Sequence, residues 1–398
     1  MTTTGHDIDL MDAKAFQAGV PHAYFRELRM RAGLHYAPDA AGYGYWHLTR
    51  HREVVAASRD TAVFSSSPST MTSVRQQSTD RPIIAFLDGR EHNRLRRLTS
   101  RGFAPGRLDG LEQRIRSITD RLLAEMSAAG RFDLAEDVAL QLPREVLVEF
   151  LGVPHSERTD LLAWSRRIVN LGDPEYHPSD AGPGPAFEKI YGCLLSLARR
   201  RETEPCDDLF SVLLSARFHD DRLTPVEVAH FATTVMNAGM ETVYSSITAG
   251  VPALLEQPGQ LALLRAHREL IPGAVEEIVR WVSPVTHFAR NVVRDVEISG
   301  QPIRAGERVV LWYTSANRDE TVFAAPDRLD VTRSPNPHVA FGGGGPHICI
   351  GGYLAAMELR CFLESWLDRL GELELTGEPV HTETNFINSY KRVPVRFR

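Results

Sequence analysis

The most reactive arrangement in the sequence is a cysteine at the end of a glycine-rich loop. The segment reads His338-Val-Ala-Phe-Gly-Gly-Gly-Gly-Pro-His-Ile-Cys-Ile-Gly-Gly352, and a helical pattern, Tyr353–Leu370, follows it. Cys349 is therefore expected at a helix N-terminus, where the helix dipole and free N–H groups stabilise a thiolate. Phosphate binding is the other common use of such a loop, but this one lacks the necessary Lys and Ser or Thr. The glycines would let the backbone lie close under a flat ligand.

A second chemical feature is an acid beside an alcohol inside an apolar helix. Thr224-Pro-Val-Glu227 is a capping box with Pro at the first helical position, so a helix should begin there and run to about Pro252. Within it, Gly239 precedes Glu241 and Thr242. A buried Glu is costly unless it is hydrogen-bonded, and Gly weakens a helix by ~1 kcal/mol relative to Ala. The pair is either catalytic or an ordinary hydrogen-bonded buried Glu.

The elements that must position these groups are mainly helical. Apolar residues at three- and four-residue spacing predict helices over Glu91–Gly102, Leu108–Ala128, Pro143–Leu151, Glu157–Val169 and Ala186–Glu202. Strand patterns are few and short: Tyr43–Thr49, Val296–Ile298, Val309–Leu311 and Val393–Phe397. Two breaker-rich stretches, Ser65–Pro82 and Leu171–Pro185, are expected to be loops.

Composition excludes several classes of protein. The 398 residues carry a net charge of −6, which argues against general nucleic-acid binding. Four cysteines cannot form a disulfide framework and are typical of a reducing compartment. The sequence shows no signal peptide, and no apolar run reaches the ~20 residues that span a bilayer. We expect a cytoplasmic protein without a membrane anchor, and a monomer.

The cysteine loop resembles the haem-binding loop of the cytochrome P-450 family, Phe-Gly-x-Gly-x-His/Arg-x-Cys-x-Gly. Its elements are matched by Phe341, Gly343, Gly345, His347, Cys349 and Gly351. The interval from Phe to Cys is one residue longer than in the commonest version, as in some bacterial members with a glycine run. The resemblance implies that Cys349 binds the iron of haem b and that Phe341 and Gly351 contact the cofactor.

Further matches in the family's order imply contacts to the haem propionates. His92-Asn-Arg-Leu-Arg96 resembles the His-x-x-x-Arg of one helix, and Arg290 matches the Arg that holds the other propionate. His347 of the cysteine loop would join them. Taken alone, His92 and Arg96 could be a solvated basic face.

The acid–alcohol pair also has a place in the family. There, residues matching Glu241 and Thr242 deliver protons during oxygen activation, and Ala238 with Gly239 opens a kink where oxygen lies. Glu277-Ile-Val-Arg280 resembles the family's Glu-x-x-Arg, a structural triad whose third member would be Arg328 in Pro326-Asp-Arg-Leu329. Ala316-Asn-Arg-Asp-Glu320 matches the motif that precedes this segment.

The resemblance implies a mainly α fold with a small β region. That fold is a triangular helical prism with haem between the long central helix and the helix after the cysteine loop. We expect one domain over residues 1–398, with a β-richer part at about 1–60 and a helical haem-binding core at about 85–375.

The implied activity is that of a haem-thiolate monooxygenase, which inserts one atom of O2 into an apolar small molecule. No flavin or NAD is expected on this chain, so electrons would come from a ferredoxin and its reductase. Such ferredoxins are acidic, and Arg94, Arg97 and Arg101 are the predicted docking residues.

The predicted substrate pocket is apolar. It would be lined by parts of Ser65–Leu87 and Trp164–Pro185 and by Phe231, Val235, Val285, His287, Phe288 and Phe386. The family resemblance favours a steroid, isoprenoid or lipid, or a secondary-metabolite intermediate. His287 could equally be a structural residue.

Two other functions share these residues. A haem-binding sensor needs no proton-delivering pair, and peroxide-driven relatives tend to lose the acid and the alcohol. Glu241 and Thr242 therefore count against both alternatives.

Overall fold

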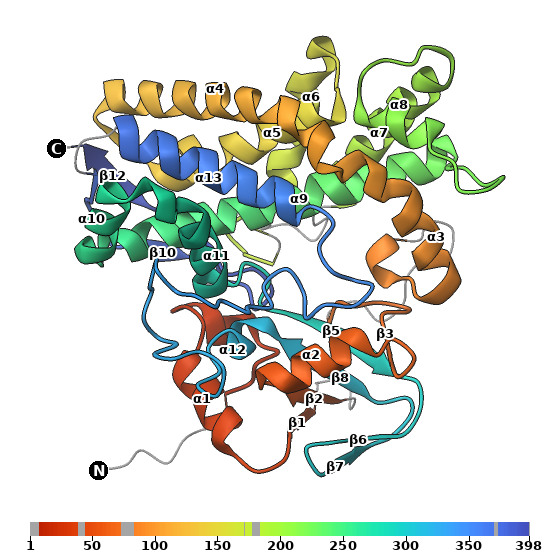
Figure 1. Cartoon of the computed structure of the whole chain (residues 1–398), viewed down its shortest axis with the longest axis vertical. Helices are drawn as coiled ribbons and strands as arrows, with labels where there is room; N and C mark the ends of the chain where they lie inside the picture. Colours follow the sequence, from red (N-terminus) through yellow and green to blue (C-terminus); the bar gives the residue numbers. More distant parts are fainter. Residues whose placement is uncertain are drawn as a thin grey trace.

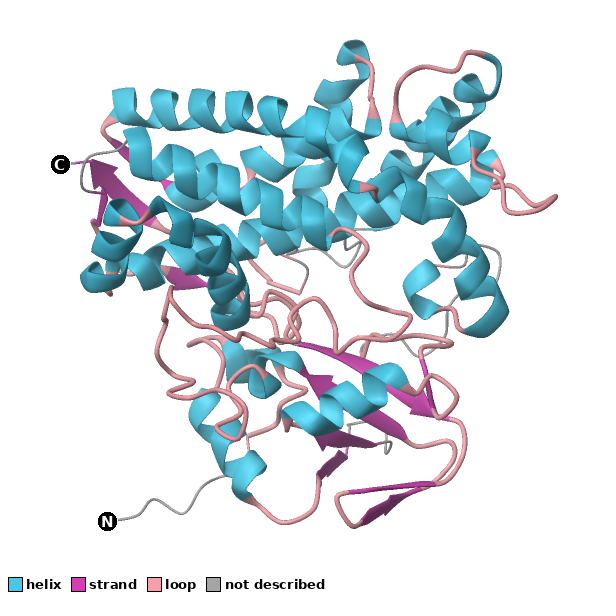
Figure 2. Cartoon of the chain, in the orientation of Figure 1, coloured by secondary structure: helices cyan, strands magenta, loops and turns pink. Residues whose placement is uncertain are grey.

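Helices and sheet occupy opposite sides of the molecule. The computed structural model describes residues 8–38, 44–72, 83–170, 172–176, 184–369 and 373–397. In Figures 1 and 2 the long helices lie together in one large layer, and the main sheet lies below them with short helices around it. The cysteine loop runs between these two parts.

The helices of the described ranges include a long central one, α9 (Pro225–Leu255). The other α-helices are α1 (His22–Met30), α2 (His51–Arg59), α3 (Gly89–Thr99), α4 (Pro105–Ala129), α5 (Gln141–Leu151), α6 (His155–Ser165), α7 (Gly184–Thr203), α8 (Leu209–Ser215), α10 (Pro258–Ala266), α11 (Ile271–Val282), α12 (Tyr313–Ala316) and α13 (Gly352–Arg369). Short helical turns are η1 (Ala13–Phe16), η2 (Ile84–Phe86), η3 (Ser100–Phe103), η4 (Ala135–Ala139), η5 (Arg166–Ile168) and η6 (Arg268–Leu270).

The main sheet has five strands in the order β1-β2-β8-β5-β3. They are β1 (His35–Pro38), β2 (Gly44–Leu48), β8 (Arg308–Trp312), β5 (His287–Val292) and β3 (Phe64–Ser65). The pair β2 and β8 is parallel, with Leu48 opposite Leu311, and the other pairs are antiparallel. Smaller sheets join β4 (Arg131–Asp133), β12 (Pro394–Phe397) and β9 (Leu373–Leu375); β6 (Val296–Ile298) and β7 (Gln301–Ile303); and β10 (Val380–His381) and β11 (Tyr390–Arg392).

The predicted helices are confirmed to within a few residues at their ends. At α9 both capping bonds are present: Glu227 N–H donates to the Thr224 hydroxyl at 3.2 Å, and Thr224 N–H donates to the Glu227 carboxylate at 2.8 Å. Pro252 does not end this helix, because Glu256 N–H still donates to the Pro252 carbonyl at 2.9 Å. Both predicted end residues of strand β6 are confirmed. Tyr43, the first residue of another predicted strand, and Leu370, at the end of the last predicted helix, lie outside the described residues.

The β-rich part is not confined to the N-terminus. Strands β1, β2 and β3 come from the first 65 residues, but β5 and β8, which complete the sheet, come from residues 287–312. Strand β5 has no counterpart among the predicted strands. Its burial does not alternate cleanly, since both faces of the sheet are covered.

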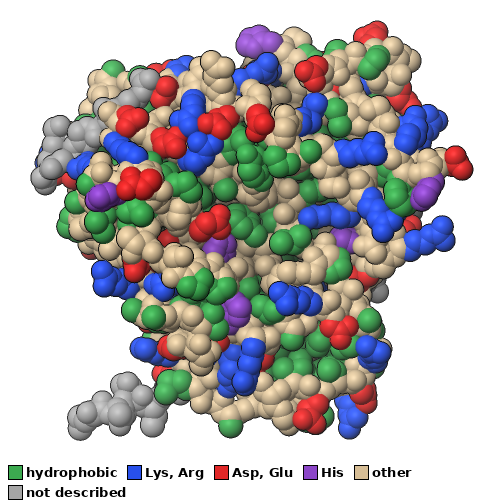
Figure 3. All heavy atoms as spheres, viewed as in Figure 1, with side chains coloured by type: hydrophobic (Ala, Val, Ile, Leu, Met, Phe, Trp, Pro, Cys, Tyr) green, Lys and Arg blue, Asp and Glu red, His purple; other side chains and the backbone are tan. Residues whose placement is uncertain are grey.

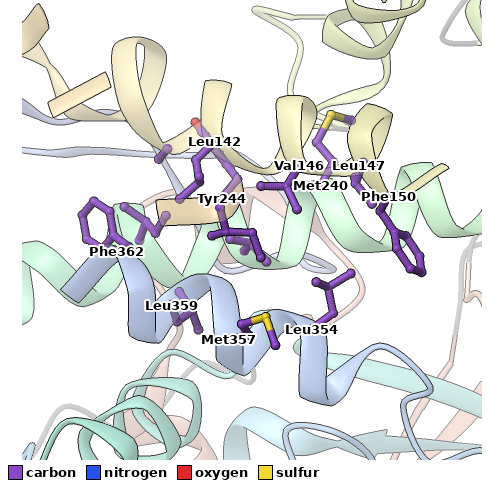
Figure 4. Packing of buried hydrophobic residues seen from close by; sticks show 14 of the residues in the cluster. Leu142, Val146, Leu147, Phe150, Met240, Tyr244, Leu354, Met357, Leu359 and Phe362 are labelled. Carbon is purple, nitrogen blue, oxygen red and sulfur yellow. The ribbon is translucent and has the colours of Figure 1, made fainter. Parts of the chain in front are cut away.

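Helix α9 forms the centre of the helical layer. Figure 4 shows Met240 and Tyr244 of α9 between side chains of α5 and α13. A β-carbon at Gly239 would lie 3.1 Å from Cδ2 of Leu147 on α5. Close packing between the two helices therefore accounts for a glycine in this apolar stretch.

The triad predicted around Glu277 exists, but its third member is Arg333 rather than Arg328. Glu277 and Arg280 are completely buried and paired at 2.7 Å, and Arg333 Nε binds the same carboxylate at 3.0 Å. Arg328 contributes only its backbone carbonyl, which accepts from Arg280 and Arg333. Its side chain is exposed. The Pro-x-Arg pattern located the right segment, but the side chain that reaches Glu277 lies five residues further on.

A cluster of aromatic rings buries two histidines behind the sheet. Trp312 Nε1–H donates to His47 Nδ1 at 2.7 Å, and the ring of His287 lies 4.5 Å from that of Trp312. Burial lowers the pKa of both His47 and His287 to about 3. A proton on His47 Nδ1 would face the indole N–H, so His47 must stay neutral in the folded protein.

This cluster predicts a specific pH dependence of stability. The folded-state pKa of His47 is below its unfolded value of about 6.5, so the unfolded chain binds more protons between about pH 3 and 6.5. His47 therefore costs about 2 kcal/mol of folding free energy at pH 5 and little at pH 7. In denaturant titrations, the destabilisation caused by His47→Gln should shrink by that amount from pH 7 to pH 5. His267→Gln, at an exposed position, should follow the wild type at both pH values. Equal pH slopes for wild type and His47→Gln would contradict the prediction.

The corrected triad predicts unequal effects of two arginine substitutions. Arg333→Ala removes one partner of a fully buried carboxylate and should cost about 3 kcal/mol. Arg328→Ala keeps the backbone carbonyl that Arg280 uses and should change the free energy of unfolding by less than about 0.5 kcal/mol. Thermal unfolding followed by circular dichroism measures both. A loss at Arg328 as large as that at Arg333 would restore the original assignment.

Candidate functional site

Cys349 lies where its loop meets α13, with its thiol accessible. Its N–H donates to the Phe341 carbonyl at 2.9 Å, which closes the loop. The residue is exposed, whereas Cys361 further along α13 is buried. Surrounding protein nevertheless raises the pKa of the Cys349 thiol by desolvation, and the backbone N–H groups of Gly351 and Gly352 and the charge of Arg96 act in the opposite direction. The expected helix N-terminus is present, and a bound cation would complete the stabilisation of a thiolate.

The glycine run before Cys349 lies against α2. A β-carbon at Gly343 would lie 2.6 Å from Ser58 Oγ, and one at Gly345 would lie 2.7 Å from the Ser58 carbonyl oxygen. Gly345 also has a φ of +78°. At these two positions the lack of a side chain lets the loop rest on α2. Phe341 packs on the first turn of α13, 3.5 Å from a β-carbon built on Gly352.

Three of the predicted propionate ligands meet beside the cysteine. Arg96 Nη2 donates to the Ile348 carbonyl at 2.6 Å, and the rings of His92 and His347 lie 4.2 Å apart. Burial and the neighbouring His347 lower the pKa of His92 to about 4, so that this imidazole is neutral at pH 7. In the part of the chain that the structure describes, its buried Nδ1 has no hydrogen-bond partner.

The fourth predicted propionate ligand, Arg290, is a buried residue of strand β5. It is 3% exposed, its Nη1 donates to its neighbour's carbonyl, and its buried Nε has no partner within the described ranges. Burial raises the pKa of Tyr313, whereas the neighbouring Arg290 and Ser58 of α2 lower it. Unsatisfied buried donors are rare in proteins. Together with the accessible thiol, His92 and Arg290 fit a ligand with carboxylates and a thiolate-binding metal, as haem is.

One face of α9 is accessible within an otherwise buried helix. Ala238 is exposed, and Thr234 and Thr242, four residues to either side, are partly exposed. Thr242 Oγ1 donates to the Ala238 carbonyl at 2.8 Å, and Glu241 is 3% exposed. The helix continues through Ala238 and Gly239 without a break in its assignment.

The predicted substrate residues fall into two groups. On α9, Phe231 packs edge-on to Phe103, and Val235 lies one turn further along. At the start of β5, Val285 pairs with Ile387, and the rings of Phe288 and Phe386 lie 5.6 Å apart. Much of the predicted loops, residues 73–82, 171 and 177–183, lies outside the described residues.

His287 does not have the surroundings of a substrate contact. It is 1% exposed, and its Nδ1 lies 2.9 Å from Thr286 Oγ1 and 3.1 Å from the Asn385 carbonyl. Its Nε2 lies 3.3 Å from Thr72 Oγ1. Both ring nitrogens have partners inside the protein, which corrects its assignment to the pocket in favour of the structural alternative.

Two carboxyl groups near the site were missed by sequence reasoning. Asp88 binds His347 from the residue before α3. Glu358 on α13 is 2% exposed, burial raises its pKa to about 8, and its Oε2 has no partner among the described residues. For Glu358 a signal existed, since a charged residue interrupts an apolar stretch. For Asp88 there was none, because its partners are distant in the chain.

No helix in the described part of the chain combines the length and apolar character that crossing a membrane requires.

The known proteins that resemble the chain match it over nearly its whole length. A family model described as cytochrome P450 matches residues 195–389. The chain is 34% identical to a steroid C26-monooxygenase of Mycolicibacterium smegmatis, over 98% of this chain and 94% of that protein. The same figures hold for a methyl-branched lipid omega-hydroxylase of Mycobacterium bovis.

Solved structures give the same result. Cytochrome P450 CYP268A2 of Mycobacterium marinum, in complex with pseudoionone, superposes with a TM-score of 0.88 at 34% identity, covering 99% of this chain and all of that one. The mainly helical fold with small sheets is therefore confirmed as the expected one. With an accessible cysteine at the end of the matching loop, the chain belongs to the cytochrome P450 family.

Proposed function

We propose that this P450 monooxygenase binds haem b through Cys349 and oxidises a steroid, an isoprenoid or a methyl-branched lipid. The observation that carries the haem site is the exposed Cys349 together with two buried polar atoms, His92 Nδ1 and Arg290 Nε, that have no hydrogen-bond partner among the described residues. The substrate class is supported by the printed activities of the two relatives and by the pseudoionone complex. The aromatic group at Phe288 and Phe386 would supply apolar contacts.

When bound, haem with a thiolate ligand supplies the activation of O2. The chain's own residues would hold the cofactor and move protons. His92, Arg96, Arg290 and His347 would hold the propionates by charge-assisted hydrogen bonds. Glu241 is buried beside Thr242, whose hydroxyl is partly exposed on the accessible face of α9. Glu241 would hold a proton and Thr242 would pass it toward oxygen.

The haem ligand and the proton pathway can be tested separately. The reduced, CO-bound protein should show the red-shifted Soret band of thiolate ligation, and Cys349→Ala should abolish it. Cys206→Ala, at an exposed cysteine far along the chain, should leave it unchanged. Folded, haem-loaded wild type without that band would refute the proposed ligand.

With a surrogate ferredoxin and reductase, Glu241→Gln should lower the rate of product formation roughly 100-fold, because one general acid is lost. Thr242→Val should lower the product formed per O2 consumed. A wild type that binds substrate but never turns over would favour a sensor. Equal turnover with peroxide alone would favour a peroxygenase.

The proposed electron donor is an acidic ferredoxin, but the predicted docking residues need revision. Arg94 is already paired with Asp221 and Glu227, both at 2.5 Å. Arg97 stacks on Phe218 at 4.7 Å. The ion pairs occupy the guanidinium of Arg94, whereas Arg97 and Arg101 are exposed and stay in the proposed docking set.

A better surface surrounds the cysteine loop. Ile348 and Tyr353 are 47% and 49% exposed on either side of Cys349. Arg59 lies beside Gly344, and Arg101 belongs to η3, whose Phe103 contacts Gly351. Figure 3 views this face, with Lys and Arg side chains gathered toward α3. A surface with an apolar centre and a basic rim is suited to bind a small acidic protein.

Charge reversal tests this surface. The double variant Arg59→Glu, Arg101→Glu should slow reduction by ferredoxin about tenfold at low ionic strength, and the difference should shrink as salt is added. Arg199→Glu, on the exposed side of α7, makes the same kind of change away from the loop and should have little effect. Stopped-flow formation of the CO complex measures the rate. Unchanged rates for the double variant would exclude this docking surface.

The free state of all four cysteines supports a reducing compartment such as the cytoplasm.

A further inference from the structure

We propose that Asp88 is a positioning residue that holds His347 at the edge of the haem site. The proposal rests on the haem site proposed above. Asp88 precedes the first residue of α3, in extended conformation, where a carboxylate would ordinarily cap the helix. It makes no such capping bond. Its side chain turns instead toward the cysteine loop and toward residues 65–67.

The two oxygens of Asp88 join three segments of the chain. Oδ1 lies 3.2 Å from His347 Nε2. Oδ2 accepts from the Ser65 hydroxyl at 2.6 Å, from Ser66 N–H at 2.8 Å and from Ser67 N–H at 3.2 Å. The start of α3, the loop after β3 and the cysteine loop therefore meet at one carboxylate.

A carboxylate such as Asp88 next to an anion-binding site is electrostatically unfavourable, unless it has another function. Burial opposes its ionisation, but hydrogen bonds from His347, Ser65 and Ser67 lower the pKa of Asp88 to about 2. The site beside it is the one in which His92 and Arg96 would bind propionates. A fixed negative charge there weakens anion binding by repulsion. Its benefit must come through the groups that it orients.

His347 is the group that Asp88 orients. The imidazole Nε2 lies between Asp88 Oδ1 and Ser66 Oγ, which is 3.1 Å away, and Ser66 is itself held by Asp88 through its N–H. The ring is thereby fixed 4.2 Å from that of His92. Without Asp88 the imidazole could turn about its side-chain bonds, because only the Ser66 hydroxyl would remain on Nε2. Partners of this kind typically change cofactor affinity 10- to 100-fold.

Haem transfer to excess apomyoglobin provides a test that does not depend on turnover. In the haem-loaded protein, Asp88→Asn should accelerate haem loss roughly tenfold, because an amide is a weaker partner for the imidazole than a carboxylate. Glu91→Gln removes the same charge from the exposed first turn of α3 and should stay within about twofold of wild type.

A double-variant cycle distinguishes positioning from a general role in folding. If Asp88 acts through His347, then Asp88→Asn should change the rate of haem loss less than twofold in a His347→Phe background. An equal acceleration in both backgrounds, or none in either, would overturn the proposal. Ser65→Ala removes a bond to Oδ2 but leaves His347 in place. An acceleration as large as that of Asp88→Asn would also overturn it, because the joining of segments alone would then explain the effect.

The haem reduction potential separates the failure of this proposal from that of the haem site. Loss of His347 orientation should shift the potential in Asp88→Asn but not in Ser65→Ala. If the wild type shows thiolate-ligated haem and Asp88→Asn shifts neither potential nor haem loss, then only the role of Asp88 is refuted. If the wild type shows no such haem, the site itself fails.

Discussion

The environment of one sulfur atom imposes conditions on the elements around it. Cys349 must be accessible enough to bind a metal, yet protein around it favours the neutral thiol over the thiolate. The N–H groups of Gly351 and Gly352 and the guanidinium of Arg96 oppose that preference. They can do so only if the loop, α3 and α13 keep a fixed relation. The contacts of Gly343 and Gly345 with α2 and of Arg96 with Ile348 maintain it.

Burial also affects other polar groups of the proposed site. His92 Nδ1 and Arg290 Nε are buried and have no hydrogen-bond partner among the described residues. Proteins normally avoid the desolvation free energy that such atoms cost. The buried carboxylate of Glu277, by contrast, accepts hydrogen bonds from Arg280, Arg333 and the N–H of Asp330. Glu277 therefore serves the fold, whereas His92 and Arg290 have polar atoms available to a ligand.

Local patterns made most of the fold predictable, whereas distant partnerships were not. The capping box at Thr224 and the periodic apolar residues of α4 and α9 depend on neighbours in the sequence, so their helices could be predicted closely. Family motifs located Cys349, His92, Arg96 and Arg290. The side chain that completes the Glu277 triad, the partners of Asp88 and the buried surroundings of His287 come from other segments of the chain, 21 to 259 positions away. No spacing rule within one segment could show them.

The composition of the main sheet has a consequence for the order in which the molecule forms. Strand β2 must wait for β8, and the bond from Trp312 to His47 closes a separation of 265 positions. Pairings so distant are slow to form. On the ribosome, the first sixty residues would therefore leave the exit tunnel long before their partners exist. The sheet can close once β8 has emerged, whereas the cysteine loop and α13, which follow β8 in the chain, emerge later. The site around Cys349 is therefore complete only near the end of synthesis, and a cofactor arriving earlier would find the cysteine loop and α13 missing.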